Sequence, residues 1–369
     1  MLTWPLITSS LRSVTNKFTI SRHLSKMVQG TMKAAVIKEF GKPIEVCQVP
    51  IPQPKKDEIL IKVAYSGICG TDHHAWKGDW PAKPNLPFIP GHEGVGRVVE
   101  VGEEVDHLKK GDLVGVPWLY NACSHCEQCF AGWETLCKNQ NNAGYSVNGT
   151  LAEYVIGDPN YVARVPEGVD LAKVAPVLCA GVTVYKGLKV TEAKAGQWVL
   201  VSGLGGLGQL GVQFAKAMGF NVIGVDIDDA KLETAKKLGA TYAFNGMTQD
   251  IGKEIHNAVG GVHGCIVTAV GRAAFGQALK AIRQRGTMVC IGIPPGDFPL
   301  DIFNTVMNGI TVRGSIVGTR IDMMEALEFF RMGKIENHVQ LDTIDNIDKV
   351  MNLMDQGKLP GRVVFDFTK

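Results

Sequence analysis

Apolar and polar residues follow two different patterns along the chain. In the first third, short runs rich in β-branched residues alternate with Pro and Gly, which is typical of strands joined by tight turns. These runs predict strands at Lys33–Lys38, Ile44–Val49, Glu58–Tyr65, Val95–Val101 and Asp112–Val116. We therefore expect a β-rich domain whose irregular loops could carry a functional site on a rigid scaffold.

From Gln197 onward, near-continuous apolar strands alternate with helical periods, which predicts a doubly wound α/β unit with a parallel sheet. Its predicted elements are Gln197–Ser202, Gln209–Met218, Asn221–Val225, Asp229–Leu238, Cys265–Ala269, Ala273–Ile282, Thr287–Ile293 and Ile310–Gly314. The remaining segment predicts helices at Asp322–Met332 and Asp345–Gln356 and a strand at Arg362–Phe367. We expect this last part to return to the first domain.

The turn between the first strand and helix of this unit carries the pattern G-x-G-x-x-G at Gly203, Gly205 and Gly208. The first glycine makes a tight turn, the second lets the backbone approach a pyrophosphate, and the third lets helix and strand pack closely. Asp226 ends the next strand, where a carboxylate hydrogen-bonds the adenosine ribose and repels a 2′-phosphate. This arrangement favours NAD over NADP, and the alternative for Asp226 is a helix N-cap.

Composition narrows the class of protein. The chain has 369 residues, of which 45% are apolar and 20% charged, as in a soluble globular protein of two domains. It contains no run of about 18 uninterrupted apolar residues, so we expect no transmembrane helix. The net charge of +2 is too close to neutral to suggest a nucleic-acid binder.

Residues 1–31 differ from the rest, because they hold four basic residues, many Ser and Thr, and no Asp or Glu. That composition is typical of a mitochondrial transit peptide and predicts a leader at 1–31 and a location in the mitochondrial matrix. The alternative is that the protein begins at Met32, which opens a strand-like run, and is cytoplasmic.

Four cysteines cluster at Cys123, Cys126, Cys129 and Cys137. Thiolates at this spacing can close a tetrahedral shell around zinc and leave no vacant position, which predicts a structural site. An iron–sulfur cluster is the competing interpretation, although the usual spacing and the following Pro are missing. Four free thiols are a further alternative.

A second group of metal-ligand types lies between Gly67 and Glu93. It includes Cys69, Thr71, Asp72, His73 and His74, and it closes with the pair His92 and Glu93. Cys, His and carboxylate are zinc ligands, and a site with two or three protein ligands keeps a position open for substrate. Isolated Cys and His residues are, however, more often ordinary packing residues.

From about Met32 to its end, the chain resembles the zinc-dependent medium-chain alcohol dehydrogenases, and within them the tetrameric microbial branch. The resemblance rests on Gly67–Asp72, Gly91–Gly96, the four-Cys loop, Leu178–Gly181, Gly203–Gly208 and Asp226. It implies a GroES-like, β-rich catalytic domain at 32–180 and 315–369 and a Rossmann NAD-binding domain at 181–314. It also implies a homotetramer.

The resemblance further implies two zinc ions, a catalytic one held by Cys69, His92 and Cys179 and a structural one held by the four-Cys loop. Asp72 would accept a hydrogen bond from the non-ligating nitrogen of His92, and Glu93 would lie close behind the metal. Each of these two acids could instead be a structural ion-pair partner, and Cys179 a buried core thiol. Cys47, Cys265 and Cys290 are expected in the core.

Further roles are implied by the same family. A proton would leave through the Thr71 hydroxyl and the nicotinamide ribose to His74, an imidazole suited to exchange with solvent, while His73 would be a surface neighbour. NAD would contact Gly203, Gly205, Gly206, Leu207, Gly208, Asp226, Lys231, Gly292, Ile293 and Arg362. Many relatives carry a basic residue where this chain has Gly70, which predicts weaker NAD binding here.

The implied reaction is reversible hydride transfer between a primary alcohol and NAD, with zinc as Lewis acid. Trp80 and Trp118 match positions that narrow the substrate pocket, which predicts ethanol to butanol as substrates, although either indole could simply pack in the core. Rival interpretations are a polyol or formaldehyde dehydrogenase, a zinc-free quinone reductase, and a zinc-stabilised interaction or nucleic-acid module.

Overall fold

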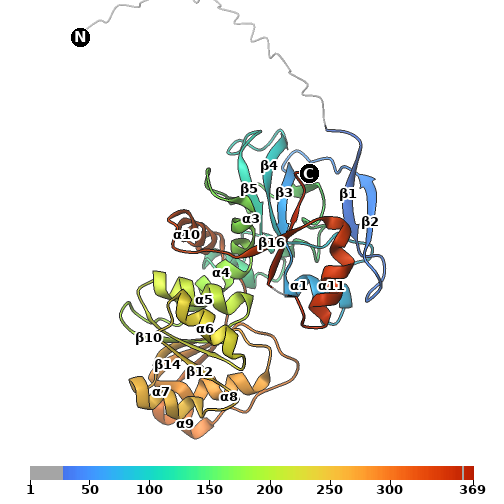
Figure 1. Cartoon of the computed structure of the whole chain (residues 1–369). Coiled ribbons are helices and arrows are strands. Elements are labelled where there is room, and N and C mark those ends of the chain that lie inside the picture. Colours follow the sequence, from blue (N-terminus) through green and yellow to red (C-terminus); the bar gives the residue numbers. More distant parts are fainter. Residues whose placement is uncertain (1–27, 360) are drawn as a thin grey trace, which may run out of the picture.

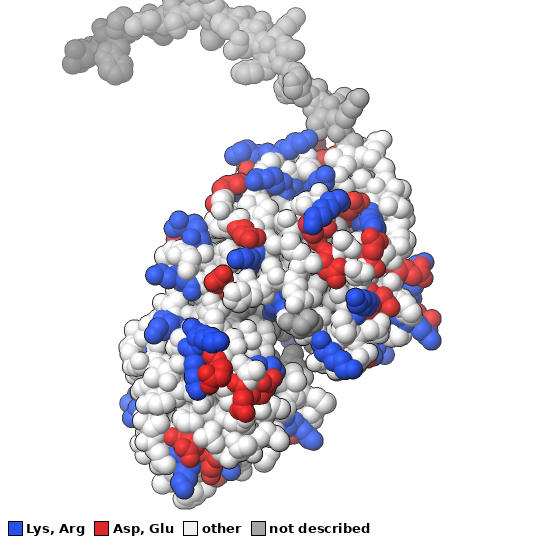
Figure 2. All heavy atoms as spheres, in the orientation of Figure 1, with Lys and Arg blue, Asp and Glu red and all other residues white. Residues whose placement is uncertain are grey.

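The computed structural model describes residues 28–359 and 361–369, so residues 1–27 of the predicted leader lie outside the described part. The described chain forms two lobes, one built mainly from strands and the other from a sheet covered by helices (Figure 1). Figure 2 shows the indentation between the lobes, with basic and acidic side chains interspersed over the visible face.

The first lobe is organised by a seven-stranded sheet in the order β16-β17-β3-β4-β5-β9, with β8 paired to β3. Its strands are β3 (Ile59–Gly67), β4 (Glu93–Val101), β5 (Leu113–Val116), β8 (Tyr154–Gly157), β9 (Ala163–Arg164), β16 (Val339–Asp342) and β17 (Arg362–Asp366). A separate antiparallel pair is formed by β1 (Thr31–Val36) and β2 (Glu45–Pro50). The predicted strands of this lobe are each found within two residues of their expected bounds.

Short elements sit around this sheet. They are α1 (Gly70–Lys77), β6 (Leu119–Asn121), α2 (Glu127–Phe130), η1 (Glu134–Leu136), β7 (Asn141–Asn142), α3 (Leu171–Val174), η2 (Ala175–Leu178), α10 (Arg320–Arg331), η3 (Ile344–Asn346) and α11 (Ile347–Asp355). The sequence pattern did not predict α1, which begins inside the group of candidate ligands between Gly67 and Glu93. Its capping box explains its position, because the Asp72 side chain binds the backbone of the N-cap residue Cys69.

The second lobe holds a six-stranded parallel sheet in the order β12-β11-β10-β13-β14-β15. Numbered along this lobe the order is 3-2-1-4-5-6, the doubly wound arrangement that the alternating pattern predicted. Its strands are β10 (Trp198–Ser202), β11 (Asn221–Asp226), β12 (Tyr242–Asn245), β13 (Val262–Val267), β14 (Ile282–Cys290) and β15 (Thr311–Gly314). Its helices are α4 (Ala180–Lys189), α5 (Gly206–Ala217), α6 (Asp229–Leu238), α7 (Ile251–Val259), α8 (Arg272–Ala281) and α9 (Ile302–Asn308).

The turn between β10 and α5 depends on its glycines. Gly203 has φ +93°, a left-handed conformation that glycine adopts without strain. A Cβ at Gly208 would lie only 1.8 Å from the carbonyl oxygen of Gly203, so α5 could not pack this close with any other residue there. A Cβ at Gly205, by contrast, would meet no described atom within 4 Å. The two outer glycines therefore serve packing, and Gly205 faces open space.

The fold class predicted from the sequence is confirmed, whereas the exact domain boundaries stay predictions. Within the described residues, no single helix is long and apolar enough to cross a membrane, and only the bent pair Leu171–Leu178 and Ala180–Lys189 passes on length and composition.

Candidate functional site

Two thiols, an imidazole and a carboxylate meet at one buried point. One ligand-type atom from each of Cys69, His92, Glu93 and Cys179 lies within 4.8 Å of the other three. Cys69 is the N-cap of α1, Cys179 is the N-cap of α4, and His92 and Glu93 stand where β4 begins. The two Sγ atoms are 3.6 Å apart. The fold thus brings Cys179 to the other residues predicted as ligands, despite its distance along the chain.

The buried carboxylate of Asp72 joins two of the segments that supply this cluster. Its Oδ2 accepts a hydrogen bond from the Cys69 N–H at 2.8 Å, and its Oδ1 accepts one from the Gly91 N–H at 2.9 Å. Oδ1 also lies 3.2 Å from Nδ1 of His92. A carboxylate at this nitrogen favours the tautomer that leaves Nε2 free to bind a ligand.

The donor set fits a metal ion. Nε2 of His92 and Oε2 of Glu93 are buried and have no hydrogen-bond partner within the described chain. An unpaired buried polar atom costs about 1–3 kcal/mol, which a bound ion would offset. Two Cys and one His are ligands that zinc prefers, and three protein ligands leave a position open for substrate.

The two thiols differ in acidity. The hydrogen bond between Cys179 and Cys69, helped by the neighbouring His92, holds the pKa of Cys69 well below its usual range although burial opposes this. The same hydrogen bond, together with burial, raises the pKa of Cys179 well above its usual range. Because the thiolate is the metal-binding form of Cys, the site already stabilises one thiolate.

Arg362 links this cluster to the glycine-rich turn. Its Nη1 donates to Oε1 of Glu93 at 3.0 Å. Burial raises the pKa of Glu93 to about 7, although the charge of Arg362 opposes that shift. Nε and Nη2 of Arg362 are buried and find no acceptor among the described residues. A Cβ at Gly206 would lie 3.2 Å from Nε of Arg362, so these unused N–H groups lie beside the turn where the phosphate loop is predicted.

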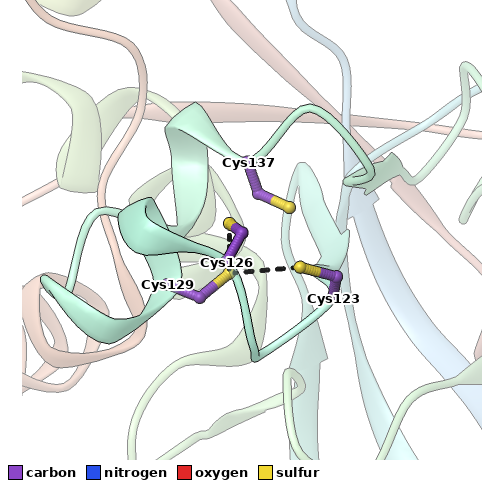
Figure 3. Close-up of side chains that lie close together, drawn as sticks. All are labelled: Cys123, Cys126, Cys129 and Cys137. Atoms are coloured by element: carbon purple, nitrogen blue, oxygen red, sulfur yellow. Dashed lines mark hydrogen bonds between the residues drawn. The ribbon is translucent and has the colours of Figure 1, made fainter.

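The four cysteines of the loop after β6 converge in a second cluster (Figure 3). The Sγ atom of Cys129 lies 3.6 Å from that of Cys126 and 4.0 Å from that of Cys123. All four sulfurs lie within 4.8 Å of one another, with Cys137 buried and the others half-buried. This geometry fits one ion with a closed shell of four thiolates.

Five of the predicted cofactor residues line a cleft between the two lobes, whereas Gly203, Gly208 and Asp226 line neither this cleft nor the adjoining cavity. The volume of the cleft is about 620 Å³, and its wall includes residues from both lobes: Cys69, Gly70, Gly205, Gly206, Leu207, Lys231 and Arg362. Gly292 and Ile293 instead line the adjoining cavity described below, which Leu207 also borders.

Asp226 ends β11 and does not itself line this cleft. Its Oδ2 accepts from the Leu204 N–H at 2.6 Å, and its Oδ1 accepts from the Ile227 N–H at 2.8 Å. The N-cap of α6 is Asp228, whose side chain accepts from Ala230. The alternative role of Asp226 as the cap of α6 is therefore wrong. Nζ of Lys231 lies 4.0 Å from Oδ1 of Asp226.

A larger, mostly apolar cavity of about 890 Å³ opens beside the buried cluster. Cys69 and Cys179 form part of its wall, together with Thr71, Trp80 and Trp118. The rings of Trp80 and Trp118 meet edge to face with centroids 6.4 Å apart. Trp118 also contacts the ring of His92 at 5.2 Å. Trp118 is buried and Trp80 is half-buried, and both line the cavity while they pack against neighbouring rings.

Two further lining residues were not expected from the sequence. Tyr145 packs its ring against Trp80 at 5.6 Å and Trp118 at 5.5 Å. No local motif marks this tyrosine, because it reaches the cavity from the loop after β7. Cys290, expected in the core, is half-buried and borders the cavity, because it ends β14 at the carboxyl edge of the sheet.

The residues of the predicted proton path lie on α1. The Thr71 hydroxyl is 3.9 Å from Sγ of Cys69 and faces the cavity. The His74 ring stacks on Trp80 with centroids 5.1 Å apart, and its Nδ1 lies 3.0 Å from Asp79. His73 contacts Asp355 instead, with Nε2 and Oδ1 2.9 Å apart.

Comparison with known proteins places each lobe. Residues 55–167 match the family described as alcohol dehydrogenase GroES-like domain, and residues 206–331 match the family described as zinc-binding dehydrogenase. An alcohol dehydrogenase of Moraxella sp. (strain TAE123) is 56% identical over 91% of this chain and 100% of its own length. One of Rhizobium meliloti is 54% identical over 91% and 99%.

A solved structure of CAD from Helicobacter pylori, complexed with NADP(H), has the same fold. It is 27% identical, has a TM-score of 0.82, and the match covers 93% of this chain and 99% of that protein.

The predicted mitochondrial location is wrong. The relatives at 52–56% identity are bacterial proteins, and bacteria have no mitochondria.

Proposed function

The chain belongs to the zinc-dependent medium-chain alcohol dehydrogenases, as its motifs predicted, and from that premise we propose that its substrates are short primary alcohols, from ethanol to butanol, and that its cofactor is NAD. The reaction is a reversible hydride transfer that gives the aldehyde and NADH. The observation that carries this proposal is that the buried Cys69–His92–Cys179 cluster borders both an aromatic cavity and the cleft at the glycine-rich turn.

Cys69, His92 and Cys179 are proposed to hold a catalytic zinc, and the four-Cys loop a structural one. When bound at the first site, zinc supplies Lewis acidity that lowers the pKa of an alcohol. Asp72 orients His92 through the 3.2 Å contact with Nδ1. Glu93 is held by Arg362 at 3.0 Å, close enough to the ligand atoms to approach the ion.

The cleft at the glycine-rich turn is proposed to bind the dinucleotide. The N-terminus of α5 and the unused N–H groups of Arg362 would face the pyrophosphate. Asp226 would accept hydrogen bonds from the ribose and repel a 2′-phosphate. Gly205 lets the cofactor approach the backbone, since nothing described lies within 4 Å of its Cβ position.

Thr71 and His74 are proposed to carry the alcohol proton outward. The Thr71 hydroxyl lies at the cavity wall beside Cys69, where it can accept a proton from a bound alcohol and donate its own. His74 has a side chain that is 35% exposed, so it can exchange that proton with water. Trp80, Trp118 and Tyr145 form an aromatic wall that limits the room for the alkyl group and excludes water.

Initial rates with a series of primary alcohols, each with NAD and with NADP, test this proposal. We expect turnover with NAD that falls in kcat/KM beyond butanol, because the aromatic wall leaves little room for longer chains. A preference for NADP, as could arise if Lys231 outweighed Asp226, would contradict the cofactor assignment. Rates that favour polyols or aldehyde adducts over simple alcohols would contradict the substrate assignment.

Gly70 provides a second test, because the family resemblance implies a basic residue at this position in many members. A Cβ at Gly70 meets no described atom within 4 Å, and the residue lines the cleft. Gly70→His should lower the Kd for NADH roughly tenfold, since one hydrogen bond to a charged group contributes about 1.5–3 kcal/mol. The matched control is Gly276→His in α8, a position equally open but outside the cleft. Fluorescence titration measures these affinities. Equal NADH affinity in wild type and Gly70→His would contradict the hypothesis that Gly70 weakens binding of the dinucleotide.

The second lobe has a surface suited to a second copy of the chain. α9 has no buried residue, and its apolar side chains Ile302, Phe303, Val306 and Met307 are each 66–77% exposed. β15, nearby, is an edge strand of the six-stranded sheet. An apolar helix next to an open strand edge is a typical assembly surface. We propose that it forms part of the contacts of a homotetramer.

Light scattering on the purified protein measures this assembly. We expect a mass about four times the 39.8 kDa of the chain. Replacing Phe303 and Val306 by Asp should reduce that mass, because each charge would have to be buried in the contact. A wild-type monomer, or a double variant of unchanged mass, would rule out this surface as the contact.

A further inference from the structure

Trp133 gives the four-Cys loop a direct place in the wall of the active-site cavity. It lies between Cys129 and Cys137, immediately before η1, and it borders the same cavity as Cys69 and Cys179. Thr135 also borders that cavity. The four-Cys loop, which was predicted to be structural, therefore also forms part of the wall of the cavity.

Two cations from other elements hold the indole. Nζ of Lys186 lies 4.2 Å from the centre of the Trp133 ring, and Cζ of Arg313 lies 5.1 Å from it. Lys186 belongs to α4 and is itself fixed by an ion pair with Asp322 at 2.9 Å. Arg313 lies on β15 and reaches Glu192 at 3.5 Å. Cation–π contacts from fixed side chains keep a planar ring in one orientation.

The backbone around Trp133 is also constrained. Its N–H donates to the carbonyl of Gln128 at 2.8 Å, and its own carbonyl accepts from the Leu136 N–H at 2.9 Å. The indole is thus positioned by the loop backbone on one side and by the cations of α4 and β15 on the other.

Trp133 borders the cavity without a ring contact to the inner aromatic group, which consists of Trp80, Trp118 and Tyr145. The ring contacts recorded among the described residues join Trp80, Trp118 and Tyr145 to one another, and Trp133 takes part in none of them. Its neighbours are Lys186 and Arg313. An alkyl chain that extends past the inner group would meet this second indole.

We propose that Trp133 is a specificity-determining residue that limits how long an alkyl chain the cavity accepts, and that Arg313 positions it. This inference rests on the proposed oxidation of primary alcohols and adds a second aromatic residue to those that limit the chain length. Arg313 does not border the cavity in the described structure, so any effect of Arg313 on chain length must act through the indole.

The test compares kcat/KM for 1-alkanols from ethanol to octanol in Trp133→Ala and wild type. We expect the ratio of hexanol to ethanol to rise at least about tenfold, because accommodating one extra methylene in an apolar pocket changes kcat/KM by roughly 10- to 200-fold. The matched control is Trp198→Ala, a half-buried indole at the start of β10 that packs on Tyr242 away from the cavity. Trp198→Ala should leave that ratio unchanged.

Variants of Arg313 test whether the orientation of the Trp133 ring matters in addition to its volume. Arg313→Leu should shift the hexanol-to-ethanol ratio in the same direction by a smaller factor, and Arg313→Lys should restore it. Trp133→Phe, which keeps a ring, should give an intermediate ratio and replaces Trp133→Ala if that variant does not fold. Unchanged ratios in the folded Trp133 variants would overturn the inference while leaving the proposed function intact. A wild type that oxidises no 1-alkanol with either cofactor would overturn the proposed function and this inference with it.

Discussion

The site depends on burying the carboxylate of Asp72 at 1% exposure. A buried carboxylate is costly unless it is paired and hydrogen-bonded. Asp72 accepts hydrogen bonds from the N–H groups of Cys69 and Gly91 and lies 3.2 Å from Nδ1 of His92. Because these partners come from α1 and from the segment before β4, satisfying one charge also places two candidate metal ligands side by side. Each hydrogen bond to this charged group contributes about 1.5–3 kcal/mol, so losing one of these partners would be costly.

Helix α4 and the side chain of Arg362 also connect the two lobes at the site. α4 is capped at its N-terminus by Cys179 of the metal cluster and carries Lys186, whose charge contacts both Asp322 and Trp133. Arg362 likewise joins Glu93 of the cluster to the glycine-rich turn of the second lobe. Movement of one lobe relative to the other would therefore change contacts at the metal cluster, the dinucleotide cleft and the cavity wall together.

The parts of the fold and of the candidate site that depend on a local motif could be predicted from the sequence. The strand–turn–helix around Gly203 to Gly208 and the spacing of the four cysteines both indicate a chemistry within a short window. Residues that meet only through the tertiary fold could not be predicted that way. Cys179 entered through family resemblance alone, and Tyr145 and Trp133 carry no local signal. Cys290 was expected in the core because its strand is apolar. It is the last residue of β14, however, and the carboxyl end of that strand opens onto the cavity. The composition of residues 1–31 suggested a mitochondrial location, and the bacterial relatives contradict it.

The metal content of the purified protein, measured by mass spectrometry, tests most directly the proposal that each chain holds two zinc ions in separate clusters. We expect about two zinc per chain in wild type and in the control Cys47→Ser, whose thiol belongs to neither cluster of the described structure. We expect about one zinc per chain in Cys126→Ser, with the first cluster still loaded. One zinc or none in the wild type, or iron in place of zinc, would contradict the proposal.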